Sequence, residues 1–393
     1  MAEHSPAISL VWVLTGVSGL LMCTVFRDRV MLSDNQKVNV MRKRYDMQVL
    51  AALSYALLSR AGMPDDKARA VADVLVRGEG FGSPTHGLAL LPAYLREIHQ
   101  GGMNLEGEPR VIQDFAACLT WDGNKLPGPW LVQRAVSEAI ARAERYGTAT
   151  VCVQNSHHAA CLSAYLQAAT ERGFIIFISL TDPGHRSVAP FGGTGAVLTS
   201  NPIALGAPTS GDPILIDMAT SLATNAIVAR KQAAGEHFST PILQDAQGQP
   251  SGDPSLLTGD TPGTILPLGG TDAGHKGYAL GLMVEILSGC LGGRGRGEVN
   301  EGWSAAITIT LHSPAAMAGN DAYLKQIDAL VQACHDSPPK PGIKRVRLPG
   351  ERGLATLAEG QRNGVPLSES LIETLSQLAA EQGLSMPLPI TSR

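Results

Sequence analysis

Two kinds of hydrophobic spacing alternate along the chain, and together they predict a mixed fold of helices and strands. Apolar residues recur at i, i+3, i+4 and i+7 within residues 47–62 and 64–80, a period typical of helices with one buried face. A third helix is predicted over residues 88–102. Residues 44 to about 103 therefore form a small helical unit.

Short apolar runs dominate the middle of the chain. Strands are predicted at 118–124, 148–154 and 174–182, with helices at 128–147 and 155–173 between them. The same two signatures continue afterwards, with a strand- and turn-rich stretch over 189–220, a strand over 305–313, and helices over 221–235, 274–293, 321–335 and 367–383. The layout is α/β, with helical segments at both ends enclosing a sheet-rich middle.

Composition and charge exclude some functions. The net charge of −4 leaves no basic excess to displace counterions, and aromatic residues make up only 5% of the chain. Nucleic acid is therefore not expected as a partner. The six cysteines form no C-x-x-C pair. Cys152 and Cys161 flank a pair of histidines without the spacing of zinc ligands, so no metal site is predicted.

The N-terminal region has two interpretations. Residues 8–26 carry no charge and are followed by basic residues, and this length is sufficient to span a bilayer. The segment is therefore either a membrane anchor or a start-site extension, since a shorter chain could begin at Met41. We favour the extension, and with it no membrane partner. For an anchor, the positive-inside rule predicts that the rest of the chain lies in the cytoplasm. We expect the same location for an extension.

Several common enzyme signatures are absent. No G-x-G-x-x-G follows a strand and opens a helix, and neither a P-loop nor a G-x-S-x-G elbow occurs. The remaining chemistry lies in polar loops with the sequences "SPTHG", "NSHH", "TSNP", "DMATS" and "GHKG".

These loops carry a family resemblance. The ordered series "THG", "NSHH", "TSNPIALGAP", "DMATS", "LPLGG", "GHKGYALGLMVEILSG" and "PGE" resembles the malate/L-lactate dehydrogenase family of NAD(P)-dependent oxidoreductases, which is unrelated to the Rossmann-type enzymes of similar name. The resemblance runs from about Tyr45 to Leu384. It implies a non-Rossmann α+β fold and a homodimer. The implied domains are an apolar extension (1–43), a helical domain (44–120 with 300–393) and an inserted, largely antiparallel NAD(P)-binding sheet domain (121–299).

The resemblance also implies roles for individual residues. His86 in "THG" corresponds to the histidine treated as proton donor to the substrate carbonyl, and His158 in "NSHH" corresponds to the family's other active-site histidine. Thr85, beside His86, is expected to contact the substrate. The cofactor-contacting segments correspond to Asn201, Pro202, Asp217, Met218, Ala219, Thr220, Ser221, Gly274, His275 and Lys276.

The residue types suit this chemistry. Reduction of a carbonyl needs an acid that titrates near neutral pH, and histidine does so. A nicotinamide, as NAD or NADP, supplies the hydride, so the protein provides orientation and electrostatics. Adjacent residues leaving a strand point in different directions. We therefore expect His158 to be the catalytic member of the pair, with His157 as a cap or supporting residue.

Some positions have ordinary structural alternatives. Asn201 before Pro202 could shape a turn, and Asp217 could cap the segment that begins at Met218. His275 and Lys276 could simply give polarity to the residues before a helix.

The chain departs from the family at places that matter for substrate. The position four after the histidine is commonly an arginine that grips a carboxylate, and here it is Leu90. An aliphatic side chain cannot replace such a clamp. Arg186, in a loop after a strand, is our candidate for the missing cation, its alternative being a solvated turn. The basic pair that often follows "DMATS" is absent, and residues 235–248 diverge from the family's loop.

The predicted function is hydride transfer between a nicotinamide cofactor and a small 2-oxo or 2-hydroxy acid. Two alternatives stay open: reduction of a cyclic imino acid, and a catalytically inactive relative that acts as a binding protein.

Overall fold

The computed structural model describes residues 43–390 of the 393-residue chain. The apolar segment 8–26, with its two interpretations, lies outside this range. Between residues 43 and 390, no helix has both the length and the apolar character needed to cross a membrane.

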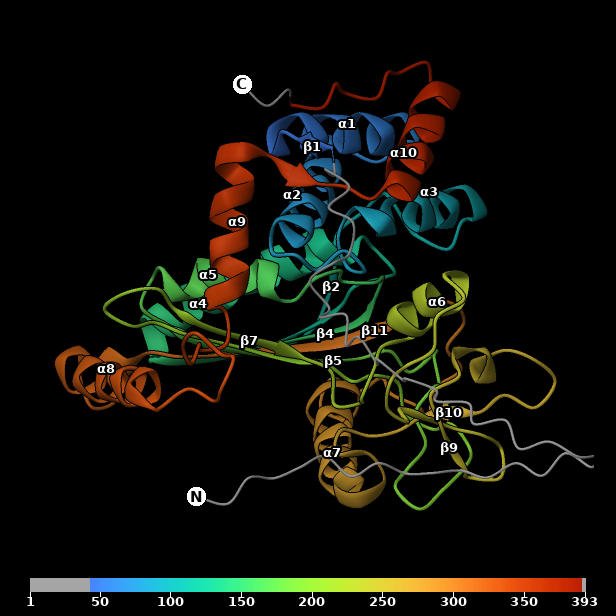
Figure 1. Ribbon diagram of the computed structural model, residues 1–393. Helices are drawn as coiled ribbons and strands as arrows, with labels where there is room; N and C mark the ends of the chain where they lie inside the picture. The colour runs from blue at the N-terminus through green and yellow to red at the C-terminus, as the bar shows by residue number, and fades with distance from the viewer. Residues whose placement is uncertain (1–42, 391–393) are drawn as a thin grey trace, which may run out of the picture. The chain divides into compact units, whose positions relative to one another are not determined.

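A seven-stranded sheet runs through the middle of the described chain (Figure 1). Its order is β2-β3-β4-β11-β5-β6-β7, and every neighbouring pair is antiparallel except β3 and β4. The strands are β2 (Arg110–Phe115), β3 (Cys118–Asp122), β4 (Thr148–Ser156), β5 (Ile175–Thr181), β6 (Ile203–Ala207), β7 (Ile214–Met218) and β11 (Ala305–His312). The largely antiparallel sheet confirms the predicted fold class, and β2 is a strand that the sequence pattern did not reveal.

Helices from both ends of the chain pack together on one side of this sheet (Figure 1). The helices are α1 (Met47–Arg60), α2 (Asp65–Gly80), α3 (Leu91–Gln100), α9 (Glu351–Asn363) and α10 (Glu369–Glu381). A two-stranded pairing of β1 (Arg44–Tyr45) with β12 (Val365–Pro366) joins the two ends. The predicted helical unit from both ends is confirmed, and α9 is an addition to it.

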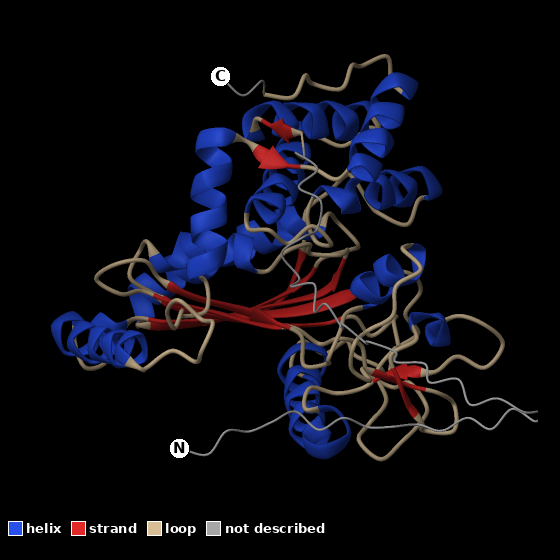
Figure 2. Ribbon diagram, viewed as in Figure 1, coloured by secondary structure: helices blue, strands red, loops and turns tan. Residues whose placement is uncertain are grey.

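The sheet is covered on both faces (Figure 2). Helices α4 (Gly128–Tyr146) and α5 (Ser163–Thr170) contact it from the side of the helical unit, and α7 (Gly270–Glu285), continued by a π-helical turn (Ile286–Cys290), contacts it from the other side. Strand β11 is accordingly buried on both faces. Ile307, Ile309 and Leu311 on one face are each 0% exposed, and Ala306 and Thr308 on the other face are 1% and 3% exposed.

The remaining elements are two helices, a small three-stranded sheet and short helical turns. Helix α8 (Asn320–Asp336) contacts the chain beyond β6, where the Tyr323 hydroxyl donates to the Pro208 carbonyl at 3.0 Å. Helix α6 (Asn225–Ala233) packs with a three-stranded sheet. That sheet and the short helical turns are β8 (Leu243–Gln244), β9 (Pro250–Ser251), β10 (Thr264–Ile265), η1 (Leu88–Leu90), η2 (Pro254–Leu257) and η4 (Pro314–Ala316). Of these turns, η1 packs with α2 and α3.

Two local predictions are wrong. The helix expected over 155–173 begins only at Ser163, because β4 continues to Ser156 and because Asn155 and Ala160 have positive φ values of 54° and 55°, which do not fit a right-handed helix. His157 and His158 therefore lie in an extended connection.

Gly274, His275 and Lys276 lie inside the helix that was expected to begin at Gly274, and not just before it. They belong to the body of α7 rather than to the residues before it, because that helix already begins at Gly270. The predicted domain boundaries at 120/121 and 299/300 stay a prediction, and the sheet takes strands from both sides of them.

Candidate active site

One edge of the large sheet collects most of the predicted site residues. Strands β4 and β5 both pair antiparallel with β11, and β7 lies two antiparallel steps from β5. Strands β4, β5 and β7 therefore end at the same edge, where β6 and β11 begin. The segments that follow or precede these ends bring together His158, Asp182, Asp217, Asn201 and Trp303.

A tight turn after α2 presents His86 to this edge. Gly87 presses against α2 so closely that a Cβ there would lie 2.8 Å from the Glu79 backbone nitrogen and 2.7 Å from its carboxylate. The same carboxylate accepts the Leu88 amide at 3.3 Å. Glycine is required for this approach, and the "THG" motif thereby fixes the position of His86.

The His86 ring is mostly enclosed. Its Nδ1 lies 3.1 Å from the Thr85 hydroxyl. Burial lowers the pKa of His86, and the Asp217 carboxylate partly opposes this shift. Thr85 thus contacts the predicted acid directly; its predicted contact with substrate stays a prediction.

His158 stacks on His86, with the ring centroids 6.0 Å apart and 16° between the ring planes. Its Nδ1 accepts the Ala160 amide at 3.2 Å and lies 2.9 Å from the Tyr94 hydroxyl. Because an amide can only donate, the proton of the neutral His158 ring is on Nε2. Burial, followed by the neighbouring His86, lowers the pKa of His158 to about 3, so this ring is neutral at physiological pH.

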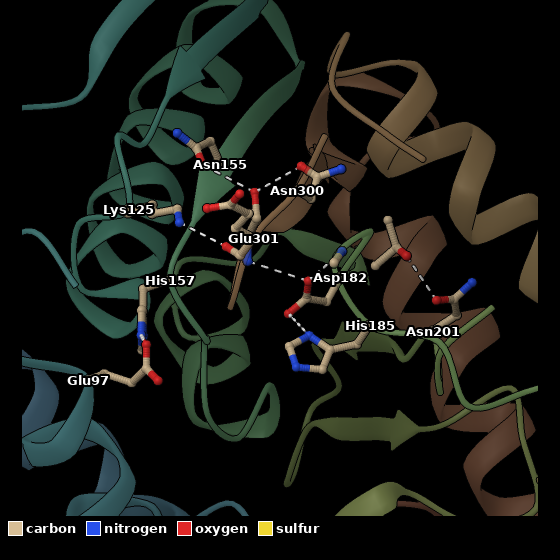
Figure 3. Close-up of polar contacts among 12 residues, drawn as sticks. Glu97, Lys125, Asn155, His157, Asp182, His185, Asn201, Asn300 and Glu301 are labelled. Atoms are coloured by element: carbon tan, nitrogen blue, oxygen red, sulfur yellow. Dashed lines mark hydrogen bonds and ion pairs between the residues drawn. The ribbon is translucent and has the colours of Figure 1, made fainter. Parts of the chain in front are cut away.

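Aromatic rings surround His157, the other histidine of the pair. His157 is 0% exposed and lies between Tyr94 and Trp303, at centroid distances of 5.5 and 4.7 Å. Its Nε2 is 3.4 Å from the Glu97 carboxylate (Figure 3), and burial lowers its pKa to about 3. These contacts agree with the supporting role expected for His157.

A cavity of about 550 Å³ opens beside His86. This volume lies within the range of small-molecule sites. Its wall includes seven of the predicted residues: Thr85, His86, Pro202, Asp217, Met218, Ala219 and Ser221. Hydroxyl groups of Ser83, Ser163 and Thr224 and the guanidinium-bearing Arg230 also belong to the lining residues. Arg230 is the one lysine or arginine among the described residues that line this cavity.

Asp217 lies at the end of β7 and binds the start of α5. Its Oδ2 accepts both the amide and the hydroxyl of Ser163, each at 2.8 Å. The negative charge suits a helix N-terminus. Asp217 therefore acts as a cap, although for α5 and not for the segment beginning at Met218. Its place on the cavity wall leaves the predicted cofactor contact open.

Asn201 is buried in a polar network outside the cavity wall. Its Oδ1 accepts the Thr181 hydroxyl at 3.0 Å, and its Nδ2 donates to the Gly281 carbonyl at 3.1 Å and to Glu285 at 2.9 Å. Its φ of 40° is unusual for a residue with a side chain. These bonds favour the alternative in which Asn201 shapes the chain.

Thr220 also bonds within the protein, because its hydroxyl donates to the Ser200 and Asn201 carbonyls. Gly274, His275 and Lys276 do not line the cavity beside His86; His275 and Lys276 are exposed, and His275 contacts the Phe191 ring. Cofactor contacts by these residues stay a prediction.

Arg186 is exposed, and no other described residue forms a hydrogen bond or ion pair with it. The structure therefore leaves its guanidinium available without placing it at His86. Leu90 packs against the main hydrophobic core, so the position of the family arginine is occupied by an apolar contact.

Four residues of the candidate site were not predicted from the sequence: Tyr94, Trp303, Asp182 and Arg230. Tyr94 and Trp303 resemble ordinary core aromatics in a single sequence. Asp182 and Trp303 share one signal that was available, since both lie next to strands that meet at the same edge. No such signal exists for Arg230, because in the sequence it is indistinguishable from a residue on the polar face of a helix.

Solved structures that match this architecture include dehydrogenases and a reductase. The solved structure of malate dehydrogenase from Pyrococcus horikoshii matches with a TM-score of 0.79 and 29% identity, over 88% of this chain and 97% of that one. The structure of Δ1-piperideine-2-carboxylate reductase from Pseudomonas syringae matches with a TM-score of 0.76 and 25% identity, over 86% and 100% of the two chains.

The family is shown by sequence as well. The model of the family described as malate/L-lactate dehydrogenase matches residues 45–376. L-lactate dehydrogenase from Cupriavidus necator is 32% identical over 346 residues, which cover 85% of this chain and 97% of that protein. The chain belongs to the malate/L-lactate dehydrogenase family, a family of oxidoreductases, which confirms the resemblance seen in its loops.

Proposed function

We propose that this protein is a nicotinamide-dependent dehydrogenase that interconverts a small 2-oxo acid and the corresponding 2-hydroxy acid. One observation carries the proposal: His86 lies on the wall of a ligand-sized cavity and stacks on His158, with both pKa values lowered by burial. Family membership supports the same reaction class, since the lactate and malate dehydrogenases among the relatives are named for 2-hydroxy acids.

His86 is the general acid and base in this proposal. When a 2-hydroxy acid is oxidised, its neutral imidazole accepts the hydroxyl proton; in the other direction, the protonated ring returns a proton to the carbonyl oxygen. Asp217 favours the protonated form. His158, with its proton on Nε2, offers a fixed hydrogen-bond donor that orients the substrate oxygen.

The cavity fits the nicotinamide half of NAD or NADP. It has the volume of a small-molecule site, hydroxyl groups at Ser83, Ser221 and Thr224, and the positive charge of Arg230 for a phosphate. The bound nicotinamide supplies or accepts the hydride. We place Pro202 and the residues from Asp217 to Ser221 along it. Gly274, His275 and Lys276 belong to the predicted cofactor contacts without lining this wall.

Other parts of the proposal rest on the resemblance alone. We propose a homodimer in the cytoplasm, with either NAD or NADP as cofactor, and residues 44–120 and 300–393 as a helical domain around an inserted 121–299 domain. The cyclic imino acid reductase is the second candidate, because a solved reductase of that type shares the fold. It differs only in protonating nitrogen in place of oxygen.

Fluorescence of NADH and NADPH tests the proposal directly. The full-length chain and a chain that starts at Met41 should each bind one of the two cofactors at micromolar concentration, and both should remain in the soluble fraction. Bound cofactor should then be consumed by 2-oxo acids faster than by cyclic imines. A folded protein that binds neither cofactor would favour the inactive-relative alternative, and a full-length chain that sediments with membranes would favour the anchor.

A further inference from the structure

The loop after β5 carries an ion pair between His185 and Asp182, close enough to His158 to affect its charge. His185 Nδ1 lies 3.1 Å from Asp182 Oδ2 (Figure 3). The other oxygen of Asp182 accepts the amides of Gly184 at 3.1 Å and Ser304 at 3.4 Å. The His185 carbonyl accepts a hydrogen bond from Arg296 at 3.0 Å. Backbone and side chain are thus both fixed, and none of the described residues bonds Nε2.

This pair is connected to the active site through one short segment. Trp303 packs on His158 with a centroid distance of 4.9 Å, and the next residue, Ser304, bonds Asp182. Asp182 and His185 both act on the charge of His158, and Glu97 acts on that of His185. The loop therefore lies within electrostatic reach of the active-site histidines.

The electrostatics distinguish His185 from the other histidines. Contact with Asp182 raises the pKa of His185, with Glu97 adding to the effect and burial and Arg296 opposing it. The pKa values of His86 and His158 are lowered. Of His86, His158 and His185, His185 is therefore the one that stays protonated to the highest pH. Its positive charge contributes to the lowered pKa of His158.

We propose that His185, held by Asp182, is the cation that binds the carboxylate of the substrate and replaces the arginine missing at Leu90. This inference rests on the proposed function. Nδ1 of the imidazolium donates to Asp182, which leaves the Nε2 proton for one carboxylate oxygen. One imidazolium offers a single donor where an arginine offers a fork, so the carboxylate is held by one charge-assisted hydrogen bond in place of two.

The test compares pyruvate with methyl pyruvate, its uncharged ester. His185→Gln keeps a polar side chain without the charge and should raise the KM for pyruvate about tenfold or more, with a smaller change in kcat. The KM for the ester should change little. His312→Gln removes an exposed histidine at the opposite end of β11 and should leave both KM values unchanged.

The pH dependence gives a readout in the unmodified protein. The protonated form binds, so the KM for pyruvate should be low below the pKa of His185 and rise as pH increases through it, while the KM for the ester stays flat. Asp182→Asn retains an acceptor for the Gly184 and Ser304 amides and should move this rise to lower pH. The charged and titratable groups around His185 are Asp182, Glu97, Arg296 and His158.

Calorimetry of oxamate binding to the cofactor complex adds a measurement that needs no turnover. Weaker oxamate binding in His185→Gln, with unchanged cofactor binding, supports the inference. Equal KM values for pyruvate in wild type and His185→Gln overturn the inference and leave the proposed function intact. The same holds if oxamate binding weakens in Arg186→Gln and not in His185→Gln. A wild type that binds cofactor but neither reduces 2-oxo acids nor binds oxamate overturns the proposed function and this inference with it.

Discussion

His157 and His158 are held neutral by burial, and the backbone of Ala160 fixes the tautomer of His158. Ala160 adopts a positive φ of 55°, and its amide donates to His158 Nδ1. Such conformations cost energy in residues with a side chain and concentrate at functional sites. Here the strained turn coincides with a fixed tautomer, so that His158 always presents the same nitrogen.

Replacement of His86 by alanine tests its role as acid and base. Turnover should fall by about 10²-fold or more, because proton transfer loses its positioned group. Binding of the reduced cofactor, followed by nicotinamide fluorescence, should be preserved. An unchanged rate would remove His86 from the mechanism.

The lowered pKa of His157 leads us to expect a specific pH dependence of the free energy of unfolding. Its pKa is lowered from 6.5 to about 3 in the folded chain, so between these values the unfolded chain binds more protons. The stabilisation is therefore present above the unfolded pKa and is lost as pH falls toward the folded value. His157→Phe keeps an aromatic ring between Tyr94 and Trp303 and removes this proton uptake.

Urea unfolding at pH 7 and pH 5 measures the effect. The wild type should lose more of its free energy of unfolding between the two pH values than His157→Phe does. Parallel losses in both proteins would show that His157 is not held neutral.

At the scale of elements, a buried ion pair ties α7 to the end of β5. Glu285, near the end of α7, receives Arg296 at 2.8 Å, and the two side chains are only 10% and 16% exposed. Asn201 and the Thr181 hydroxyl bond the same carboxylate at 2.9 and 2.8 Å. This network holds the loop that carries His185, since Arg296 also bonds the His185 carbonyl.

Arg296→Met should destabilise the chain by about 3–5 kcal/mol, because it leaves the Glu285 carboxylate buried without its cation. The midpoint of urea unfolding reports the change. Arg345→Met breaks a pair whose arginine is 66% exposed and should cost less than about 1 kcal/mol. Similar losses of free energy of unfolding in both variants would mean that the buried network stabilises the chain no more than an exposed ion pair does.

Element types were largely predictable from the sequence, and the connections between them were not. The helical period of residues 47–62 and the apolar run at 148–154 were sufficient, because local pattern determines such elements. The error at His157 and His158 arose because Asn155 and Ala160 adopt positive φ values, which a hydrophobic period does not reveal. Strand β2 has every residue exposed, and its apolar residues Val111, Ile112 and Phe115 do not alternate with polar ones, so the period that identifies a half-buried strand is missing.

The site was predictable only where a family motif marks it. His86 and His158 were found through "THG" and "NSHH", and the structure brings the two rings together. The contribution of Tyr94 depends on a hydrogen bond across 64 residues of sequence. Such a contact follows from the packing of α3 against the end of β4, which no local pattern contains.

For the whole molecule, the position of β11 has a consequence for synthesis. This strand lies between β4 and β5, yet it is the last of the seven to be made. A chain emerging from the ribosome therefore holds two half-sheets, β2-β3-β4 and β5-β6-β7, each with an unpaired edge. Unpaired edges are sites of aggregation, so the nascent chain is most vulnerable in this interval. Insertion of residues 305–312 closes the gap and brings Trp303 against the histidines, so the proposed active site is completed only after this late strand has been made.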